Sequence, residues 1–139
     1  MKIPEFISHS YEDTFKFGFS FGQKCKGGEV FLLSGELGSG KTVFTKGFAK
    51  GLGLNELIIS PTFNIVNEYS GHLKLFHFDL YRLASCDELF DIGFEDYRSD
   101  DSVCILEWGD KCKDAFESPV IFIQFSHLSM NNRRIEVFS

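Results

Sequence analysis

Apolar positions in the first quarter of the chain predict a helix followed by a buried strand. Residues 10–26 have helical periodicity with Ser10 as the N-cap, and the glycine pair 27–28 ends the segment. We expect this helix to pack on a sheet through Phe15, Phe19, Gly22 and Cys25. The continuous apolar run 30–33 follows, and such a run is typical of a strand buried on both faces.

The remaining apolar runs predict further strands and an α/β fold. Residues 103–107 form a second continuous run, which ends in a carboxylate. Alternating or apolar runs predict two antiparallel pairs, 63–69 with 72–78 and 120–125 with 134–138. We therefore predict one α/β domain over residues 1–139, with central parallel strands, added antiparallel strands and flanking helices.

Three further segments are predicted to be helical. The stretch after Gly40 is amphipathic, with apolar residues at Val43, Phe44, Phe48 and Leu52. Ser85 and Glu88 have the spacing of a capping box, which predicts a short helix ending at Ile92. Residues 110–116 are long enough for one or two helical turns. These helices would cover the faces of the sheet.

The segment between the first strand and the next helix has the spacing of a phosphate-binding loop. It reads Gly35-Glu36-Leu37-Gly38-Ser39-Gly40-Lys41-Thr42. Small residues let the backbone curl until several N–H groups point at phosphate oxygens, and the N-terminus of the following helix adds partial positive charge. The pattern predicts that Lys41 reaches the β- and γ-phosphates and that Thr42 ligates Mg²⁺. We expect a compact P-loop NTPase domain.

Composition narrows what this domain can bind and where it works. A net charge of -6 argues against a broad basic face that holds nucleic acid directly, and the 17 phenylalanines supply bulk for a core. The four cysteines form no C-x-x-C pair, so we expect reduced thiols. The N-terminus lacks a signal-peptide pattern, and no apolar run approaches the roughly 18 residues that span a bilayer, which leads us to expect a cytoplasmic protein.

Two carboxylates end predicted strands, which is where the sites of α/β proteins gather. A bound nucleoside triphosphate brings about four negative charges, so the site needs a lysine, Mg²⁺ and at least one acid. Glu107 is expected to position the attacking water or to hold the metal through water, and Asp79 to supply an outer-sphere metal contact. The alternative for each is a surface carboxylate that caps the next helix.

Three other features each allow two interpretations. Thr62 is either a switch residue that ligates Mg²⁺ or senses the γ-phosphate, or an ordinary loop residue after Pro61. Trp108 is either a core residue or an interface anchor. An acidic stretch is either a solvated face or a docking surface for a partner, and comprises Asp91, Glu95, Asp96, Asp100 and Asp101.

Taken together, four motifs closely resemble the TsaE (YjeE) family of bacterial P-loop ATPases. They are the phosphate-binding loop, Ser60-Pro61-Thr62-Phe63, His77-Phe78-Asp79-Leu80-Tyr81-Arg82 and Glu107-Trp108. The resemblance covers nearly the whole chain, and the order and spacing of the last three motifs are specific to this family. It implies a role in forming threonylcarbamoyladenosine beside the anticodon of tRNAs that read codons beginning with A. It also implies docking on TsaB and TsaD, with ATP hydrolysis needed for repeated turnover of that complex.

The resemblance also implies roles for individual residues. The nucleotide would be held by Glu36, Leu37, Gly38, Ser39, Gly40, Lys41, Thr42 and Trp108. The metal would be served by Thr42, Asp79 and Glu107, and catalysis by Lys41, Thr62, Asp79 and Glu107. The chain departs from the family pattern at Glu36, whose side chain receives no role, and at Asn64, which replaces a common hydroxyl residue. The acidic charge fits this interpretation, because the partners would hold the tRNA.

Features that the sequence lacks argue against two rival functions and indicate slow hydrolysis. A metabolite or nucleotide kinase usually needs an acceptor-binding insertion and an arginine-bearing lid, and this chain has four arginines, of which only Arg82 lies near a site motif. A GTP-driven switch protein usually carries Asn-Lys-x-Asp or Thr-Lys-x-Asp, which is missing here. We expect slow hydrolysis by the free chain, altered by partners. The sequence does not indicate how adenine is held, and it leaves weak self-association open.

Overall fold

The computed structural model describes residues 2–36, 38–56, 58–59, 65–116 and 119–138. Within these residues, seven strands form one sheet in the order β1-β7-β6-β2-β5-β4-β3. The strands are β1 (Lys2–Ser8), β2 (Val30–Ser34), β3 (Val66–Tyr69), β4 (Lys74–Asp79), β5 (Ser102–Glu107), β6 (Ile121–His127) and β7 (Arg133–Phe138). Strands β6, β2, β5 and β4 are parallel, whereas the pairs β1–β7, β6–β7 and β3–β4 are antiparallel. The predicted mixed α/β sheet is confirmed.

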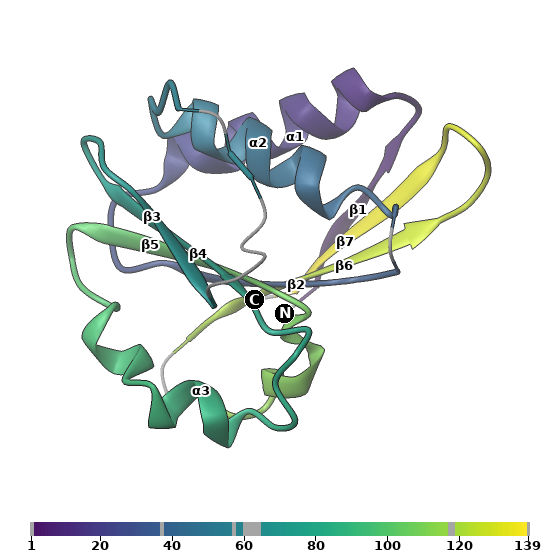
Figure 1. Cartoon of the computed structure of the whole chain (residues 1–139). Coiled ribbons are helices and arrows are strands. Elements are labelled where there is room, and N and C mark those ends of the chain that lie inside the picture. Colours follow the sequence, from purple (N-terminus) through teal and green to yellow (C-terminus); the bar gives the residue numbers. More distant parts are fainter. Residues whose placement is uncertain (1, 37, 57, 60–64, 117–118, 139) are drawn as a thin grey trace.

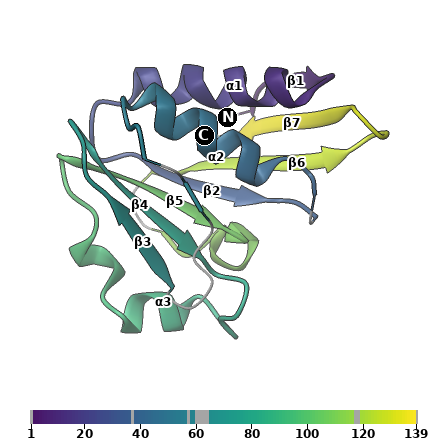
Figure 2. The same ribbon diagram turned by 45° about the horizontal axis from the view of Figure 1, so that its top comes forward.

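Helices cover both faces of the sheet (Figures 1 and 2). One face carries α1 (Tyr11–Lys24) and α2 (Lys41–Gly51). The other carries α3 (Asp87–Asp91) and the short 3₁₀ helices η1 (Phe94–Asp96) and η2 (Gly109–Cys112). Phenylalanines fill both interfaces: Phe31, Phe44, Phe48 and Phe125 under α1 and α2, and Phe78 and Phe94 on the opposite side. This burial supplies the main driving force for folding.

Strand β2 lies at the centre of the sheet, as its continuous apolar sequence predicts. All five of its residues are buried, with β5 on one side and β6 on the other. Strand β5 is buried along its whole length as well, between β2 and β4. Strands enclosed in this way hold their carboxyl ends rigidly at one edge of the sheet. The P-loop starts at that edge, directly after β2, and Glu107 is the last residue of β5 at the same edge.

The packing of α1 differs from the prediction, because its most buried face is made of small residues. Thr14, Gly18 and Gly22 are buried, whereas Phe15 and Phe19 are only half-buried. A Cβ atom at Gly18 would lie 2.2 Å from the carbonyl oxygen of Phe44 in α2. Helix α1 therefore packs mainly on α2, with the backbones in contact, and the expectation of simple packing on the sheet was incomplete.

Three elements also differ from the prediction. Strand β1 was not expected, because its sequence contains Pro4 and has little alternation; its pairing with β7 defines it. Helix α3 has Cys86 as its N-cap rather than Ser85, although the Glu88 carboxylate still accepts the Ala84 N–H at 3.0 Å. The segment predicted over 110–116 is the single 3₁₀ turn η2.

The cysteine prediction is wrong for two of the four residues. Cys86 and Cys112 form a disulfide that joins the N-cap of α3 to η2, with Cα atoms 5.2 Å apart. Cys25 and Cys104 are free, as expected. The sequence gives no sign of this pair, because its members are 26 positions apart and belong to no motif.

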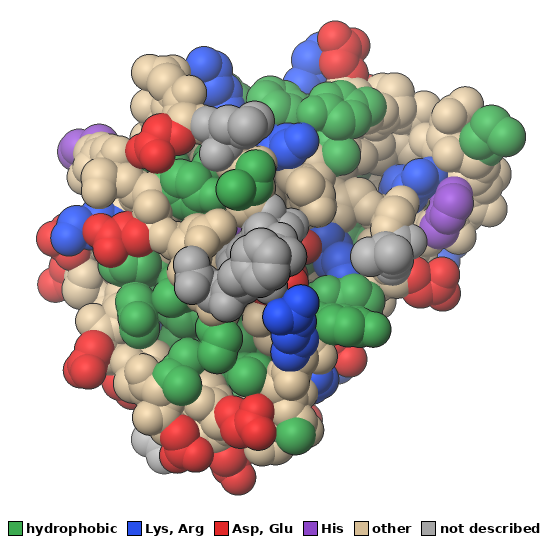
Figure 3. Space-filling model, viewed as in Figure 1, with side chains coloured by type: hydrophobic (Ala, Val, Ile, Leu, Met, Phe, Trp, Pro, Cys, Tyr) green, Lys and Arg blue, Asp and Glu red, His purple; other side chains and the backbone are tan. Residues whose placement is uncertain are grey.

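Two features of the surface bear on the expectations from composition. The acidic stretch is exposed, and acidic side chains gather over α3 (Figure 3). In the described part of the chain, no helix is both long and apolar enough to cross a membrane. The solvated face predicted for the stretch is present, and its alternative role as a docking surface stays a prediction.

Candidate functional site

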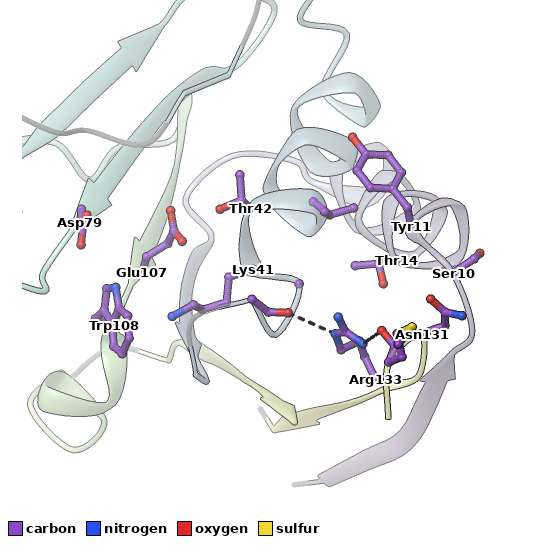
Figure 4. Close-up of a pocket in the computed structure, with 14 residues that line it drawn as sticks. Ser10, Tyr11, Thr14, Lys41, Thr42, Asp79, Glu107, Trp108, Asn131 and Arg133 are labelled. Atoms are coloured by element: carbon purple, nitrogen blue, oxygen red, sulfur yellow. Dashed lines mark hydrogen bonds between the residues drawn. The ribbon is translucent and has the colours of Figure 1, made fainter. Parts of the chain in front are cut away.

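The carboxyl ends of the central parallel strands open onto a cavity of about 480 Å³, within the range typical of small-molecule sites. The P-loop follows β2, Glu107 ends β5 and Asp79 ends β4. Figure 4 shows Asp79, Glu107 and Trp108 on one side of the cavity, with Lys41 and Thr42 in the middle. The other side is formed by the start of α1 and by the connection between β6 and β7. Strand order thus brings together three motifs that are far apart in sequence.

The backbone of the P-loop has the conformation that its glycines allow. Gly35, Gly38 and Gly40 have φ angles of +148°, +79° and +109°, values that other residues rarely adopt. A Cβ atom at Gly35 would lie 2.6 Å from the carbonyl oxygen of Phe125, so only glycine fits there. A Cβ at Gly38 would meet nothing within 4 Å, because this backbone borders the open cavity.

Donors for an anion are available where α2 begins. Gly40 is the N-cap, and no side chain caps the helix, so its first N–H groups have no intrahelical acceptor. The Ser39 hydroxyl is buried and has no hydrogen-bond partner among the described residues. A buried polar group without a partner is costly unless a ligand satisfies it. These observations fit a phosphate group at this position.

Lys41 is buried and contacts two groups of its own chain. Its Nζ donates to the carbonyl oxygen of Gly35 at 2.7 Å and lies 3.4 Å from the centroid of the Trp108 ring. Burial lowers the pKa of the ammonium below its ordinary value, while nearby carboxylates, chiefly Glu107 and Asp79, act in the opposite direction. The cavity therefore offers a buried ammonium group, whose charged form an anionic ligand would stabilise.

Asp79 and Glu107 lie opposite each other on neighbouring strands. The Asp79 Oδ1 accepts the Tyr81 N–H at 3.0 Å, and the Glu107 side chain is buried at the wall of the cavity. Mg²⁺ bound to a nucleotide needs only one or two carboxylates beside phosphates and waters. Two carboxylates and the Thr42 hydroxyl in one cavity fit that requirement. Within the described residues, no group of three or more His, Cys, Asp or Glu side chains is placed to hold a metal.

Trp108 has a strained backbone that orients its ring. Its φ of 62° makes it the one non-glycine residue with positive φ in the described part of the chain. The ring packs against Tyr81, with centroids 5.0 Å apart, and against the ammonium of Lys41. A Cβ at the next residue, Gly109, would lie 2.7 Å from that of Leu32, so the chain passes close to β2 here. Such strain is found at functional sites.

Half of the cavity was missed by sequence reasoning. Its residues are Ser10, Tyr11, Thr14, Val43, Met130, Asn131 and Arg133. No recognised motif includes them, and only folding brings the start of α1 beside the connection that precedes β7. The side chain of Arg133 donates to the carbonyl oxygen of Gly38 at 3.2 Å. In the sequence, Arg82 is the one arginine near a site motif; in the structure Arg133 lines the cavity, whereas Arg82 is exposed and is not among the lining residues.

Two predicted site residues, Glu36 and Ser39, are described but are not among those that line the cavity, and two others cannot be compared with it. Leu37 and Thr62 lie outside the described residues, as do the rest of Ser60-Pro61-Thr62-Phe63 and Asn64. Glu36 is exposed, and its backbone oxygen accepts the Ser39 N–H at 3.1 Å. Glu36 thus shapes the loop through its backbone, and its predicted contact with a nucleotide stays a prediction.

Comparison with protein families gives one match over most of the chain. Residues 8–135 match the family model described as "Threonylcarbamoyl adenosine biosynthesis protein TsaE". A relative from Treponema pallidum (strain Nichols), named tRNA threonylcarbamoyladenosine biosynthesis protein TsaE, is 40% identical over 131 residues, which cover 94% of this chain and 97% of the relative. A Bacillus subtilis (strain 168) protein of the same name is 50% identical over 85 residues, or 60% of this chain and 52% of the relative.

A solved structure has the same fold. The crystal structure of Bacillus subtilis YdiB superposes with a TM-score of 0.77 and 31% sequence identity. The superposition covers 99% of this chain and 86% of that one. The similarity therefore extends over the whole sheet and both helical layers.

Proposed function

Because the chain belongs to the TsaE family of threonylcarbamoyladenosine biosynthesis proteins, we propose that it binds and hydrolyses ATP with Mg²⁺ to support repeated turnover in that tRNA modification. One observation carries the proposal: strand order brings Lys41 and Thr42 into one cavity with Asp79 and Glu107. P-loop enzymes need a cation that binds the phosphates, a hydroxyl that ligates the metal, and acidic side chains that serve the metal and the attacking water. The cavity holds all three kinds of group.

The phosphates are proposed to lie against the start of α2. The free N–H groups of its first turn and the partial positive charge of the helix end both favour an anion there. The Lys41 ammonium would exchange its contact with the Gly35 carbonyl for phosphate oxygens, which are stronger acceptors because they are charged. Trp108 would keep the ammonium at the cavity wall until a nucleotide arrives.

The acids are proposed to divide metal binding from activation of water. Thr42 would ligate Mg²⁺ directly, and Asp79 would hold it through water. When bound, Mg²⁺ would supply neutralisation of charge that develops on the phosphate oxygens. Glu107, buried at the wall and beside Lys41, would orient the attacking water and accept its proton. Thr62, as a switch residue, belongs to the same proposal.

The nucleoside is proposed to occupy the side of the cavity that sequence reasoning missed. Tyr11 and Met130 line this side and are 60% and 85% exposed, so two large apolar side chains face solvent at its mouth. A base that stacks there would cover them. A Tyr11→Ala variant that loses affinity for ATP, and keeps its affinity for inorganic tripolyphosphate, would support this placement; equal affinities for ATP in the variant and the parent would contradict it.

Partner proteins are proposed to complete the active state. Arg133 is already bonded to backbone carbonyls of Gly38, Ser129, Met130 and Asn132. An unengaged arginine supplied in cis or by a partner can raise phosphoryl transfer by roughly 10³ to 10⁵. Slow hydrolysis by the free chain, changed on docking to TsaB and TsaD, is consistent with this arrangement. The tRNA would then be held by the partners, because this chain is acidic.

Product analysis with a panel of nucleotides distinguishes this function from its rivals. We expect ATP to be preferred over GTP and to yield ADP and inorganic phosphate at equal rates, with no transfer to nucleosides or sugars. Phosphorylated product from such an acceptor would favour a small P-loop kinase. Preference for GTP would favour a switch protein. A Lys41→Ala preparation gives the background from contaminating phosphatases.

A further inference from the structure

An imidazole occupies a buried position in strand β4 between two phenylalanines. His77 lies in β4 between Phe76 and Phe78 and is fully buried. It shares a face of the strand with Leu75, which belongs to the core under α1 and α2. Burial of a polar side chain is unfavourable unless a partner compensates it. The identity of that partner indicates what His77 does.

The partner of His77 is the carboxylate at the end of the next strand. The imidazole Nε2 and the Glu107 Oε2 are 2.5 Å apart. A carboxylate can only accept, so the imidazole Nε2–H is the donor. The register explains the contact: His77 lies opposite Ile105, and Glu107 is two residues further along β5 on the same face. Two rigid, buried strands therefore hold both ends of this hydrogen bond.

The bond restrains Glu107, which among the described residues is the one acid that is both buried and part of the cavity wall. A glutamate side chain has three rotatable bonds, and an unrestrained carboxylate would sample several positions. With Oε2 held by His77 from inside the sheet, the carboxylate has a defined position beside Lys41 and Asp79 (Figure 4). Asp79 differs, because its contact is with the backbone of its own loop at Tyr81.

We propose that His77 is a positioning residue for ATP hydrolysis, which holds the Glu107 carboxylate where it orients the attacking water. The inference rests on the function proposed above for Glu107. His77 itself is not among the residues lining the cavity and would not touch the nucleotide. Its effect is therefore on the rate of the chemical step rather than on nucleotide affinity.

A simpler account is that the pair only satisfies two buried polar groups and stabilises the sheet. The two accounts differ in what a substitution changes. Loss of packing alone would lower stability and leave the turnover of the folded fraction intact. Loss of positioning would lower the turnover number kcat while the dissociation constant for Mg·ATP stays nearly the same.

The test compares His77→Leu, which removes the donor, with His77→Gln, whose amide N–H can reach the same carboxylate. Phe76→Leu is the matched control, because it perturbs the buried neighbour on the opposite face of β4. We expect kcat to fall about 10- to 100-fold in His77→Leu, the range found when outer-shell partners of ligating residues are removed. We expect His77→Gln to recover most of this loss, and Phe76→Leu to lower the melting temperature without lowering kcat.

Affinity and a double variant complete the design. Mg·ATP affinity, measured by calorimetry, should change less than threefold, roughly, in both His77 variants. In a Glu107→Gln background, His77→Leu should cause no further loss of kcat, since it acts through Glu107. If His77→Leu does not fold, His77→Asn replaces it, because its shorter amide does not reach the carboxylate.

The outcomes separate this inference from the proposed function. Hydrolysis by the parent chain together with full kcat in His77→Leu would overturn the positioning role alone. Absence of hydrolysis by the parent, with and without partners, would overturn the proposed function and the role of His77 with it. A lowered kcat that His77→Gln restores, at unchanged affinity, would establish both.

Discussion

Single residues of the P-loop either have a partner that a phosphate would replace or lack a partner that a phosphate would supply. The Lys41 ammonium is held by the Gly35 carbonyl and by the ring of Trp108, and the Ser39 hydroxyl is buried without a partner in the described part of the chain. The strained φ of Trp108 keeps its ring over the ammonium. A bound phosphate would therefore gain a charged donor without long-range rearrangement of the sheet.

The separate roles of Lys41 and Glu107 predict different defects in two alanine variants. Lys41→Ala should weaken Mg·ATP binding about 10- to 150-fold, because a hydrogen bond to a charged group contributes about 1.5–3 kcal/mol. Glu107→Ala should bind Mg·ATP nearly normally and lose about 10²- to 10⁴-fold in turnover, the range for general base catalysis. Calorimetry and phosphate release measure the two effects.

The control for charge on the same helix is Lys50→Ala, because Lys50 is exposed in the last turn of α2. It should change neither affinity nor turnover. Equal losses of nucleotide affinity in Lys41→Ala and Glu107→Ala would refute the division of roles.

At the scale of elements, α1 and α2 pack closely through glycines that belong to no functional motif. A Cβ atom at Gly47 would lie 2.0 Å from the carbonyl oxygen of Phe15, and one at Gly51 would lie 2.2 Å from that of Phe19. On α1, Gly18 and Gly22 lie equally close to backbone carbonyl groups of α2. This close packing supports α2, whose first turn borders the cavity.

The close glycine contacts predict that adding one methyl group, by substituting alanine for a glycine, lowers stability substantially. Gly47→Ala should lower the free energy of unfolding by about 2 kcal/mol, because overpacking against a backbone atom costs about 1–3 kcal/mol or more and outweighs the gain of up to about 1 kcal/mol in helix propensity. Urea unfolding followed by circular dichroism measures the change. Lys50→Ala should stay within about 0.5 kcal/mol of the parent. An unchanged or raised stability in Gly47→Ala would show that the helices can separate at no cost.

The disulfide and the buried thiols predict the outcome of thiol titration. The unreduced, denatured chain should show two thiols, Cys25 and Cys104, and the reduced chain should show four. Burial raises the pKa of Cys25 and of Cys104 to about 12. The thiolate reacts with alkylating reagents, so both should react slowly in the folded protein at pH 8, with rates rising about tenfold per pH unit. Fast alkylation of either cysteine at pH 8, or four thiols without reductant, would contradict this account.

For the whole molecule, the sequence predicted the order of most strands and helices but not how distant segments meet. Continuous apolar runs identified β2 and β5 because both are buried on two faces. The P-loop and the acids at strand ends followed from motifs and spacing. In contrast, β1, Arg133 and the side of the cavity lined by Tyr11 and Met130 depend on pairing between the ends of the chain, which leaves no local pattern. The Cys86–Cys112 bond was missed because its members are 26 positions apart and belong to no motif.

His77 shows what the sequence can and cannot indicate about function. Its motif pointed to Asp79, and the imidazole two residues earlier had no assigned role. The register of β4 and β5 is needed to place it against Glu107. A buried histidine flanked by phenylalanines is itself a sign of a polar partner, although it does not name that partner.

For the molecule as a whole, we propose that ATP hydrolysis at this cavity drives repeated cycles of a tRNA-modifying complex. The most direct measurement is ATP turnover by the purified chain, alone and with TsaB, TsaD and tRNA, alongside formation of modified tRNA over many cycles. We predict slow turnover by the free chain, a change in rate with the complex, and loss of multiple-cycle modification when Lys41→Ala replaces the parent. Turnover that does not respond to the partners, with modification continuing in the presence of Lys41→Ala, would contradict the claim.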